Sequence, residues 1–417
     1  MQKKYALHQQ LYTLAFVILS VKNVLDSSQL IHRPDWMDNL FVLSFFALIG
    51  WKFMLQRYTK PMLFGTMFFG AIFAFVSFRM SYFFLLFTFC GLAALQNVDL
   101  KKVLRYTSIT KILMILLHVI PYLVMKMISP EQVEYVWRNG VRREFFYIGH
   151  PNTFSMYVGW AILEFTFAFY EQLRVIHLIG LWFVNYIVYQ YTDSNTSIMV
   201  ATIVLSLFIL DRTRPKLTAK IVTPIARYGY AVCAVFFTVI TIWFTSMPAP
   251  IKQLYLQLND FFTGRLLFGS FAYEYFGIAW IGNPAVRFPG KRFFEGFWVD
   301  SLVFDNTYIY LLVYYGAIFL PIFSIAFLWL GKDKERNPAR NLEKILIIAY
   351  TFFAIMENYA NNAVLCFPVL FVGQKIFVEY EKRRAKKREE RLQALDKMKN
   401  IDGVKYECDI KCGNTCV

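Results

Sequence analysis

The chain has 417 residues, of which 57% are hydrophobic and 19% are aromatic, and its formal net charge is +16. So large an apolar fraction excludes an ordinary soluble domain, whose core cannot absorb it, whereas a lipid-facing helix bundle can. The excess Lys and Arg residues are divided among short loops, which disfavours a nucleic-acid-binding protein.

Apolar runs follow one another along the chain at lengths close to the roughly 20 helical residues that cross a hydrocarbon core of about 30 Å. Because backbone groups in lipid must be hydrogen-bonded within their own segment, each run predicts a helix. We therefore predict an all-α polytopic integral membrane bundle over residues 1–380, with about 12 transmembrane helices and one long external loop. The predicted spans are 9–26, 38–55, 61–78, 80–97, 108–128, 153–170, 175–191, 197–211, 228–246, 303–330, 343–359 and 363–380.

Basic residues in alternate short loops predict the cytoplasmic side of the bundle. These residues are Lys3, Lys4, Arg57, Lys60, Lys101, Lys102, Arg105, Arg212, Arg214, Lys216, Lys220, Lys332, Lys334 and Arg336. A basic tail, 381–417, follows the last span, so both termini are predicted to be cytoplasmic. Its Cys408, Cys412 and Cys416 fit no standard zinc spacing and favour solvated thiols, with a metal site or lipidation as the alternatives.

The two largest predicted external loops, about 128–152 and 246–301, carry basic residues on the side that should be poor in them. These residues are Arg138, Arg142, Arg143, Lys252, Arg265, Arg287, Lys291 and Arg292. Longer translocated loops tolerate such charges, which is one interpretation. As a set, the arginines predict a pocket for an anion, because guanidinium binds phosphate or carboxylate through two hydrogen bonds. At a membrane surface the large anions are lipid head groups, polyprenyl diphosphates included. The stretch Ile251 to Phe271 also suits a short amphipathic helix at the membrane surface.

The sequence Gly149-His150-Pro151-Asn152 joins the first of these loops to the next span. Its Gly and Pro predict a turn, and Asn152 is expected to cap the following helix. His150 would lie at the membrane boundary, where it can donate to a phosphate or act as a general base toward a sugar hydroxyl. The alternative is a boundary histidine bonded to a carbonyl group.

Acidic and amide side chains gather at the predicted outer ends of two late spans. Asp305 and Asn306 would lie slightly inside the bundle, which favours a functional role, whereas Asp300 suits a helix cap. Glu357 lies at the outer end of another span and is expected to complete the same cleft.

Four short motifs in this order resemble Wzy-type polymerases of surface polysaccharide, including capsule, exopolysaccharide and O-antigen polymerases, and the likeness is to the Gram-positive ones. They are Gly-His-Pro-Asn at 149–152, Thr-Gly-Arg at 263–265, Gly-Asn-Pro at 282–284 and Asp-Asn-Thr-Tyr at 305–308. The resemblance covers the layout of spans over most of the chain, and its recognisable residues fall between Gly149 and Tyr308.

The resemblance implies a glycosyltransferase of the bacterial plasma membrane that needs neither a metal nor another cofactor. Its donor would be a growing glycan on undecaprenyl diphosphate, and its acceptor a repeat unit on a second such lipid. The implied further partners are membrane lipid, a chain-length regulator and a flippase, with no nucleic acid. His150, Arg265 and Asp305 are the implied catalytic residues. The implied substrate-binding and diphosphate-binding residues are Arg138, Arg142, Arg143, Asn152, Arg287, Asn306 and Glu357.

Other classes of membrane protein remain open. A secondary transporter or lipid-linked glycan flippase should show two pseudo-repeated halves and interrupted helices with charges near the membrane midplane. An O-antigen-ligase-type glycan transferase shares the architecture, but a ligase histidine is expected in the long loop, whereas His150 lies in the earlier one. A scaffold or an envelope acyltransferase is the remaining alternative.

Overall fold

The structure is a computed structural model that describes residues 2–138, 140–286, 290–299, 305–332 and 340–412. The chain divides into two compact units, Met1–Gly373 and Gln374–Val417. Within the second unit, the described residues belong to one long helix, α15 (Leu370–Cys412), which begins in the first unit.

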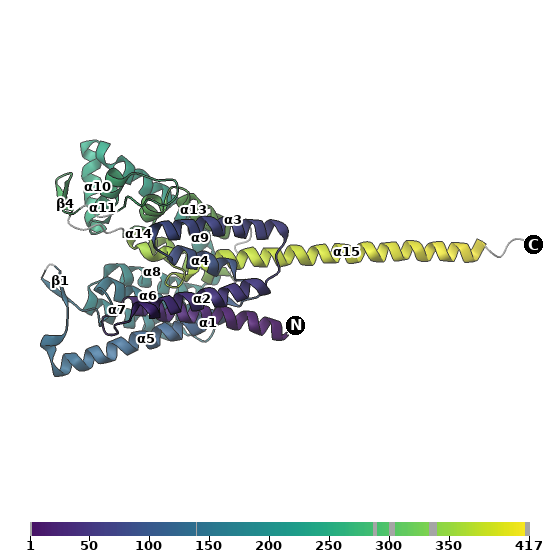
Figure 1. Cartoon of the computed structure of the whole chain (residues 1–417), viewed down its shortest axis with the longest axis horizontal. Helices are drawn as coiled ribbons and strands as arrows, with labels where there is room; N and C mark the ends of the chain where they lie inside the picture. The colour runs from purple at the N-terminus through teal and green to yellow at the C-terminus, as the bar shows by residue number, and fades with distance from the viewer. Residues whose placement is uncertain (1, 139, 287–289, 300–304, 333–339, 413–417) are drawn as a thin grey trace, which may run out of the picture. The chain divides into compact units, whose positions relative to one another are not determined.

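The first unit is a bundle of helices (Figure 1). They are α1 (Gln2–Asp26), α2 (Asp35–Leu55), α3 (Lys60–Met80), α4 (Phe84–Ala93), α5 (Leu100–Ile128), α6 (Pro151–Phe169), α7 (Val175–Thr192), α8 (Asn195–Thr213), α9 (Pro215–Trp243), α10 (Ala249–Phe261), α11 (Arg265–Phe276), α12 (Thr307–Ile309), α13 (Phe319–Leu330) and α14 (Asn341–Met356). Short 3-10 and π-helical turns connect several of them: η1 (Pro130–Gln132), η2 (Phe244–Ser246), η3 (Tyr310–Tyr315), η5 (Asn358–Asn361) and η6 (Phe367–Val369).

In the part of the chain that the structure describes, five helices are long and apolar enough to cross a membrane: α2, α3, α5, α8 and α9. Their outward faces carry large apolar side chains, for example Leu43 at 67%, Phe64 at 74% and Val235 at 64% exposure. Exposed apolar side chains in such number are typical of helices that face lipid. The protein is therefore a mostly helical, membrane-embedded bundle, while the number of spans and their orientation stay predictions.

Helices α6 and α14 form the centre of the bundle. Both are buried along almost their whole length, which is the pattern of an enclosed helix. α6 packs against α5, α7 and α8, and α14 packs against α8 and α9. Predicted site residues lie at one end of each of these helices, at the N-terminus of α6 and just after the C-terminus of α14.

Three predicted spans differ from the helices observed. Residues 80–97 contain only the short α4, and residues 363–380 begin with η6 before α15. The span expected at 303–330 is divided into α12, the π-helical η3 and α13, with Gly316 between η3 and α13 at φ 108°. A Cβ on Gly316 would lie 2.6 Å from the carbonyl oxygen of Trp280, so the close approach of that backbone explains this break.

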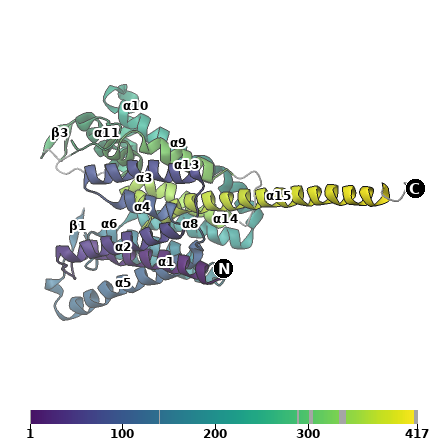
Figure 2. The same ribbon diagram turned by 45° about the vertical axis from the view of Figure 1, so that its right-hand side comes forward.

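Two β-hairpins lie at one end of the bundle (Figures 1 and 2). The first pairs β1 (Val136–Arg138) with β2 (Val141–Arg143), and the second pairs β3 (Arg292–Phe294) with β4 (Phe297–Val299), both antiparallel. The long predicted loop thus contains regular structure: α10, α11 and the second hairpin. The stretch 251–271, expected to suit a short amphipathic helix, contains most of α10 and the first part of α11. The two helices are separated because Thr263 and Gly264 adopt left-handed conformations at φ 56° and φ 88°.

Candidate functional site

Arg265 begins α11 and is the centre of a buried cluster of charges. Its side chain is 7% exposed, Nε lies 3.3 Å from Asp305 Oδ2, and Nη2 lies 3.4 Å from Glu357 Oε1. The left-handed Thr263-Gly264 pair turns the chain into α11, and the Thr263 hydroxyl accepts a hydrogen bond from Arg265. One guanidinium therefore lies against carboxylates from two other elements.

The two carboxyl groups differ in their surroundings. Glu357 follows the last residue of α14 and is 6% exposed at its side chain, whereas Asp305, just before α12, is 24% exposed. Burial raises the pKa of Asp305, and the Arg265 charge opposes that rise. Burial also raises the pKa of Glu357, and the Asp305 charge raises it further against the opposing charge of Arg265. The two carboxyls, taken as a pair, therefore hold a proton more readily than two ordinary carboxylates.

Arg143, at the end of β2, supplies a second buried guanidinium, with 2% of the residue exposed. Its Nε donates to the Thr192 carbonyl at 2.6 Å, and Nη2 donates to Asn152 Oδ1 at 2.6 Å. Burial lowers the pKa of Arg143, and the charges of Arg138 and Arg265 lower it further. The Asp193 charge opposes this fall, and a bound anion would relieve the repulsion that Arg143 experiences from the other two arginines.

His150 is the residue that caps α6. Its backbone is extended at φ −124°, and its Nδ1 accepts a hydrogen bond from the Asn152 backbone N–H at 3.3 Å. The expectation that Asn152 caps this helix was wrong, because Pro151 takes the first helical position and Asn152 lies inside, bonded to Arg143.

The protonation of His150 follows from this cap. Burial lowers the pKa of His150, and the charges of Arg143 and Arg138 lower it further, so the ring is neutral near pH 7. Because Nδ1 is an acceptor, the proton of the neutral ring lies on Nε2. In this arrangement Nε2–H is a donor, which suits binding a phosphate or hydroxyl oxygen better than acting as a general base.

The other predicted residues divide between the site and the scaffold. Arg142 is exposed, and its guanidinium lies 4.1 Å from the centroid of the Tyr135 ring. Arg138 ends β1 and is half-buried. Asn306 caps α12 by accepting from the Ile309 N–H at 3.2 Å, and its amide group donates to the Ile355 carbonyl at 3.1 Å. Both ends of the Asn306 side chain are therefore used by backbone groups, which makes it a structural residue.

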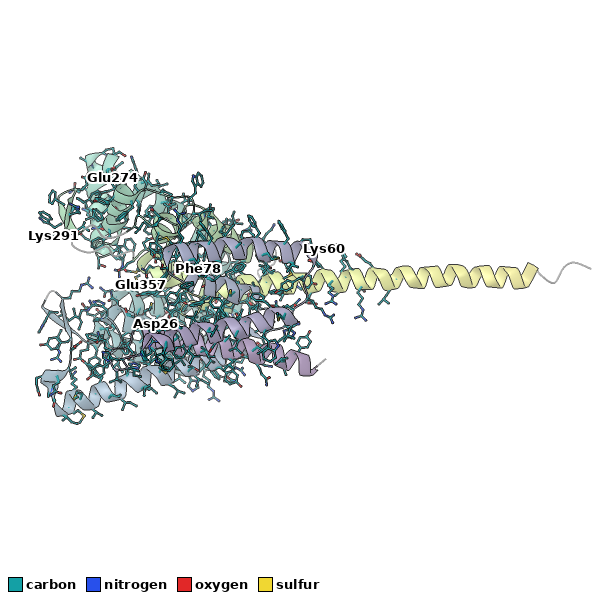
Figure 3. All side chains as sticks on the ribbon, viewed as in Figure 1. Asp26, Lys60, Phe78, Glu274, Lys291 and Glu357 are labelled. Carbon is teal, nitrogen blue, oxygen red and sulfur yellow. The ribbon has the colours of Figure 1, made fainter. Side chains whose placement is uncertain are left out.

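Arg287 and Asp300 lie outside the described residues. Glu357 lies toward the same end of the bundle as Lys291 and opposite to Lys60 (Figure 3).

A cleft of about 440 Å³ opens beside the first hairpin. Its lining includes Gln29, Gln132, Tyr135 and Gly149, the residue before His150. Glu131 and Glu134 also line it, so it would disfavour an anion and suit neutral polar groups.

Some residues with a role at the site had no assigned role in the sequence analysis. The Thr307 hydroxyl donates to the Glu357 carbonyl and so ties α12 to the end of α14. Tyr359, in η5, has a pKa raised by burial and by the charge of Glu357, so it lies within the same electrostatic environment. Thr307 lies inside the Asp-Asn-Thr-Tyr motif, and Tyr359 lies two residues after Glu357. These positions are the sequence features that could have indicated a role for the two residues.

The chain matches no known family model, no curated protein and no solved structure.

Proposed function

We propose that the protein is a polysaccharide polymerase of the membrane, which transfers a growing glycan from a polyprenyl diphosphate to a lipid-linked repeat unit. The observation that carries the proposal is the buried guanidinium of Arg265 with the Asp305 and Glu357 carboxyls against it. A second buried guanidinium, Arg143, has a pKa that the Arg265 charge lowers. A cation able to bind a diphosphate thus lies beside raised-pKa carboxyls able to accept a proton.

In the proposed reaction, an acceptor hydroxyl oxygen attacks the anomeric carbon of the donor glycan. The bond from that carbon to the diphosphate oxygen breaks, and the lipid diphosphate leaves with the electron pair. Arg265 and Arg143 stabilise the charge that develops on the leaving group. Asp305 takes the hydroxyl proton, because it is the more exposed of the two carboxyls, and His150 donates from Nε2.

The cleft beside the first hairpin would hold sugar rather than phosphate. Its amide and carboxylate groups can accept from and donate to hydroxyl groups, and its volume of about 440 Å³ suits a short oligosaccharide. Gly149 lies on its wall, so a glycan bound there would reach toward His150.

A lipid-linked glycan flippase is the second candidate. The interrupted helices at η3 and at 357–369 favour it, because broken helices often form the transport sites of membrane carriers. The gathering of arginines at one end of the bundle favours the polymerase instead.

The experiment is the glycan profile of a deletion strain complemented with wild type, Arg265→Ala or Arg292→Ala at matched expression. Arg292 is an exposed arginine of β3 and controls for loss of one positive charge. Single lipid-linked units accessible outside the membrane, converted to polymer by wild type and by Arg292→Ala only, would support the proposal. In the deletion strain, single units trapped inside the cell would support the flippase, and full-length polymer left on its lipid would support a ligase. A glycan profile unchanged by the deletion would refute the polymerase, the flippase and the ligase alike. Arg265→Lys should restore little polymer, since an ammonium does not reproduce the planar fork.

A further inference from the structure

A second pair of opposite charges lies in the interior of the bundle. Lys111 of α5 and Glu164 of α6 form an ion pair, with side chains 3% and 0% exposed. The Thr107 hydroxyl also donates to Glu164. Lys111 lies about 16 Å along the helix axis from Leu100, which places the pair near the middle of α5. Ionised groups at such depth are costly, and their retention points to a role.

The Lys111 ammonium has a further acceptor, the backbone carbonyl of Val364. Val364 belongs to the connecting segment, defined here as residues 357–369 between α14 and α15, which forms only the 3-10 turns η5 and η6. Backbone of this kind inside a membrane bundle leaves donors and acceptors that its own segment cannot satisfy. Side chains of other helices must therefore bond to it.

Other hydrogen bonds also hold the connecting segment, including that from Thr307 to the Glu357 carbonyl. The Thr88 hydroxyl, from α4, donates to the Asn361 carbonyl at 2.6 Å and accepts from the Ala363 N–H at 2.9 Å. The Asn361 amide donates to the Tyr315 hydroxyl at 2.9 Å. The connecting segment is thus fixed from α4, α5 and η3, and its first residue is Glu357.

We propose that Lys111 is a positioning residue for the outer site. Its ammonium, oriented and neutralised by Glu164, holds the Val364 carbonyl and thereby fixes the connecting segment that presents Glu357 to Arg265. The inference rests on the proposed function, because Glu357 matters through its contact with Arg265. If the ion pair only packed the interior of the bundle, removing both charges together would leave the connecting segment as it is in wild type.

The test compares Lys111→Met, Glu164→Leu and the double variant of the full-length chain in detergent. Each single variant should lower Tm, because it leaves the other charge unpaired. The double variant should regain most of the wild-type Tm, because apolar side chains of similar size replace a buried pair with little penalty. The Val364 carbonyl nevertheless lacks its donor in the double variant, so the connecting segment should open more often.

The first readout is alkylation of Cys366 by N-ethylmaleimide, followed by peptide mapping. Cys366 is fully buried in the connecting segment. We expect labelling to be about tenfold faster in the double variant than in wild type. The second readout is polymer formation, where kcat should fall about tenfold or more while KM for the lipid-linked repeat unit changes little. A double variant with wild-type Tm, labelling rate and kcat would overturn the proposal.

Thr88→Val provides an independent test, because it removes the donor to Asn361 without changing any charge. It should increase Cys366 labelling and lower kcat in the same way. The matched control is Thr166→Val in α6, a buried hydroxyl that donates only within its own helix, to the Ile162 carbonyl. Equal labelling in Thr88→Val and Thr166→Val would contradict the proposal. If labelling responds as expected but wild type makes no polymer, the proposed function fails while the positioning of the segment stands.

Discussion

Replacing Arg265 with alanine removes the cation that lies between the Asp305 and Glu357 carboxyls. Removing one partner of a buried ion pair costs about 3–5 kcal/mol. Asp305 has 24% of its side chain exposed and is partly screened by solvent, which reduces its share. We therefore expect a loss of about 3 kcal/mol at neutral pH, at the lower end of that range.

The loss of stability in Arg265→Ala should become larger as pH rises. Arg265 lowers the pKa of both carboxyls, so its removal raises their folded-state pKa further above the unfolded-state value. A raised folded-state pKa contributes stability that is present at low pH and lost as pH rises through it. Arg265→Ala should therefore be close to wild type at low pH and fall progressively below it as pH rises.

The assay is thermal unfolding of the purified full-length chain in detergent, followed by tryptophan fluorescence from about pH 5 to about pH 8. Arg292→Ala is the control, because it removes an exposed arginine and should show a small difference that hardly changes with pH. A deficit for Arg265→Ala that is constant over this range, or equal to that of the control, would refute the reasoning.

The remaining predictions concern the residues around this cluster. His150→Asn should keep the cap of α6 and the wild-type Tm, whereas His150→Ala should lose about 1 kcal/mol in thermal unfolding, and equal stability of the two would argue against the cap. Asn152→Leu should cost about 1–3 kcal/mol by leaving a buried donor of Arg143 unpaired, measured in the same way. Gly316→Ala should lower the yield of folded protein on size-exclusion chromatography, because φ is 108° and a Cβ would lie 2.6 Å from a backbone oxygen. Polymer formation should rise with pH as the raised-pKa carboxyl of Asp305 loses its proton, and Asp305→Asn should abolish both the activity and that rise.

Apolar periodicity was enough to predict a mostly helical membrane bundle. The apolar runs that include Leu43 and Val235 indeed form long helices with lipid-facing side chains. Asp305 and Glu357 both contact Arg265, so the structure brings these two predicted residues together, while the cleft between them stays a prediction. Charges at the ends of apolar runs are visible in a sequence, so this part could be predicted.

The breaks within predicted helices could not be predicted in the same way. An apolar run shows that a segment is buried but not where its backbone hydrogen bonds go, and at Asn361 and Val364 the partners are Thr88 and Lys111, far away in the sequence. Lys111 and Glu164 inside predicted spans were the signal for such an interior contact. The cap of α6 was misassigned for a related reason, since the preference for asparagine at a cap does not report that Arg143 already binds the Asn152 side chain.

The contact of Arg265 with two acidic groups also affects how the site would take up a ligand. An anion that binds this guanidinium competes with Asp305 and Glu357, and its own charge raises their proton affinity once it has arrived. Anion binding and proton uptake are therefore thermodynamically linked, so each should strengthen the other. Calorimetry of pyrophosphate binding in two buffers with different ionisation enthalpies should show protons taken up on binding, and Asp305→Asn should take up fewer.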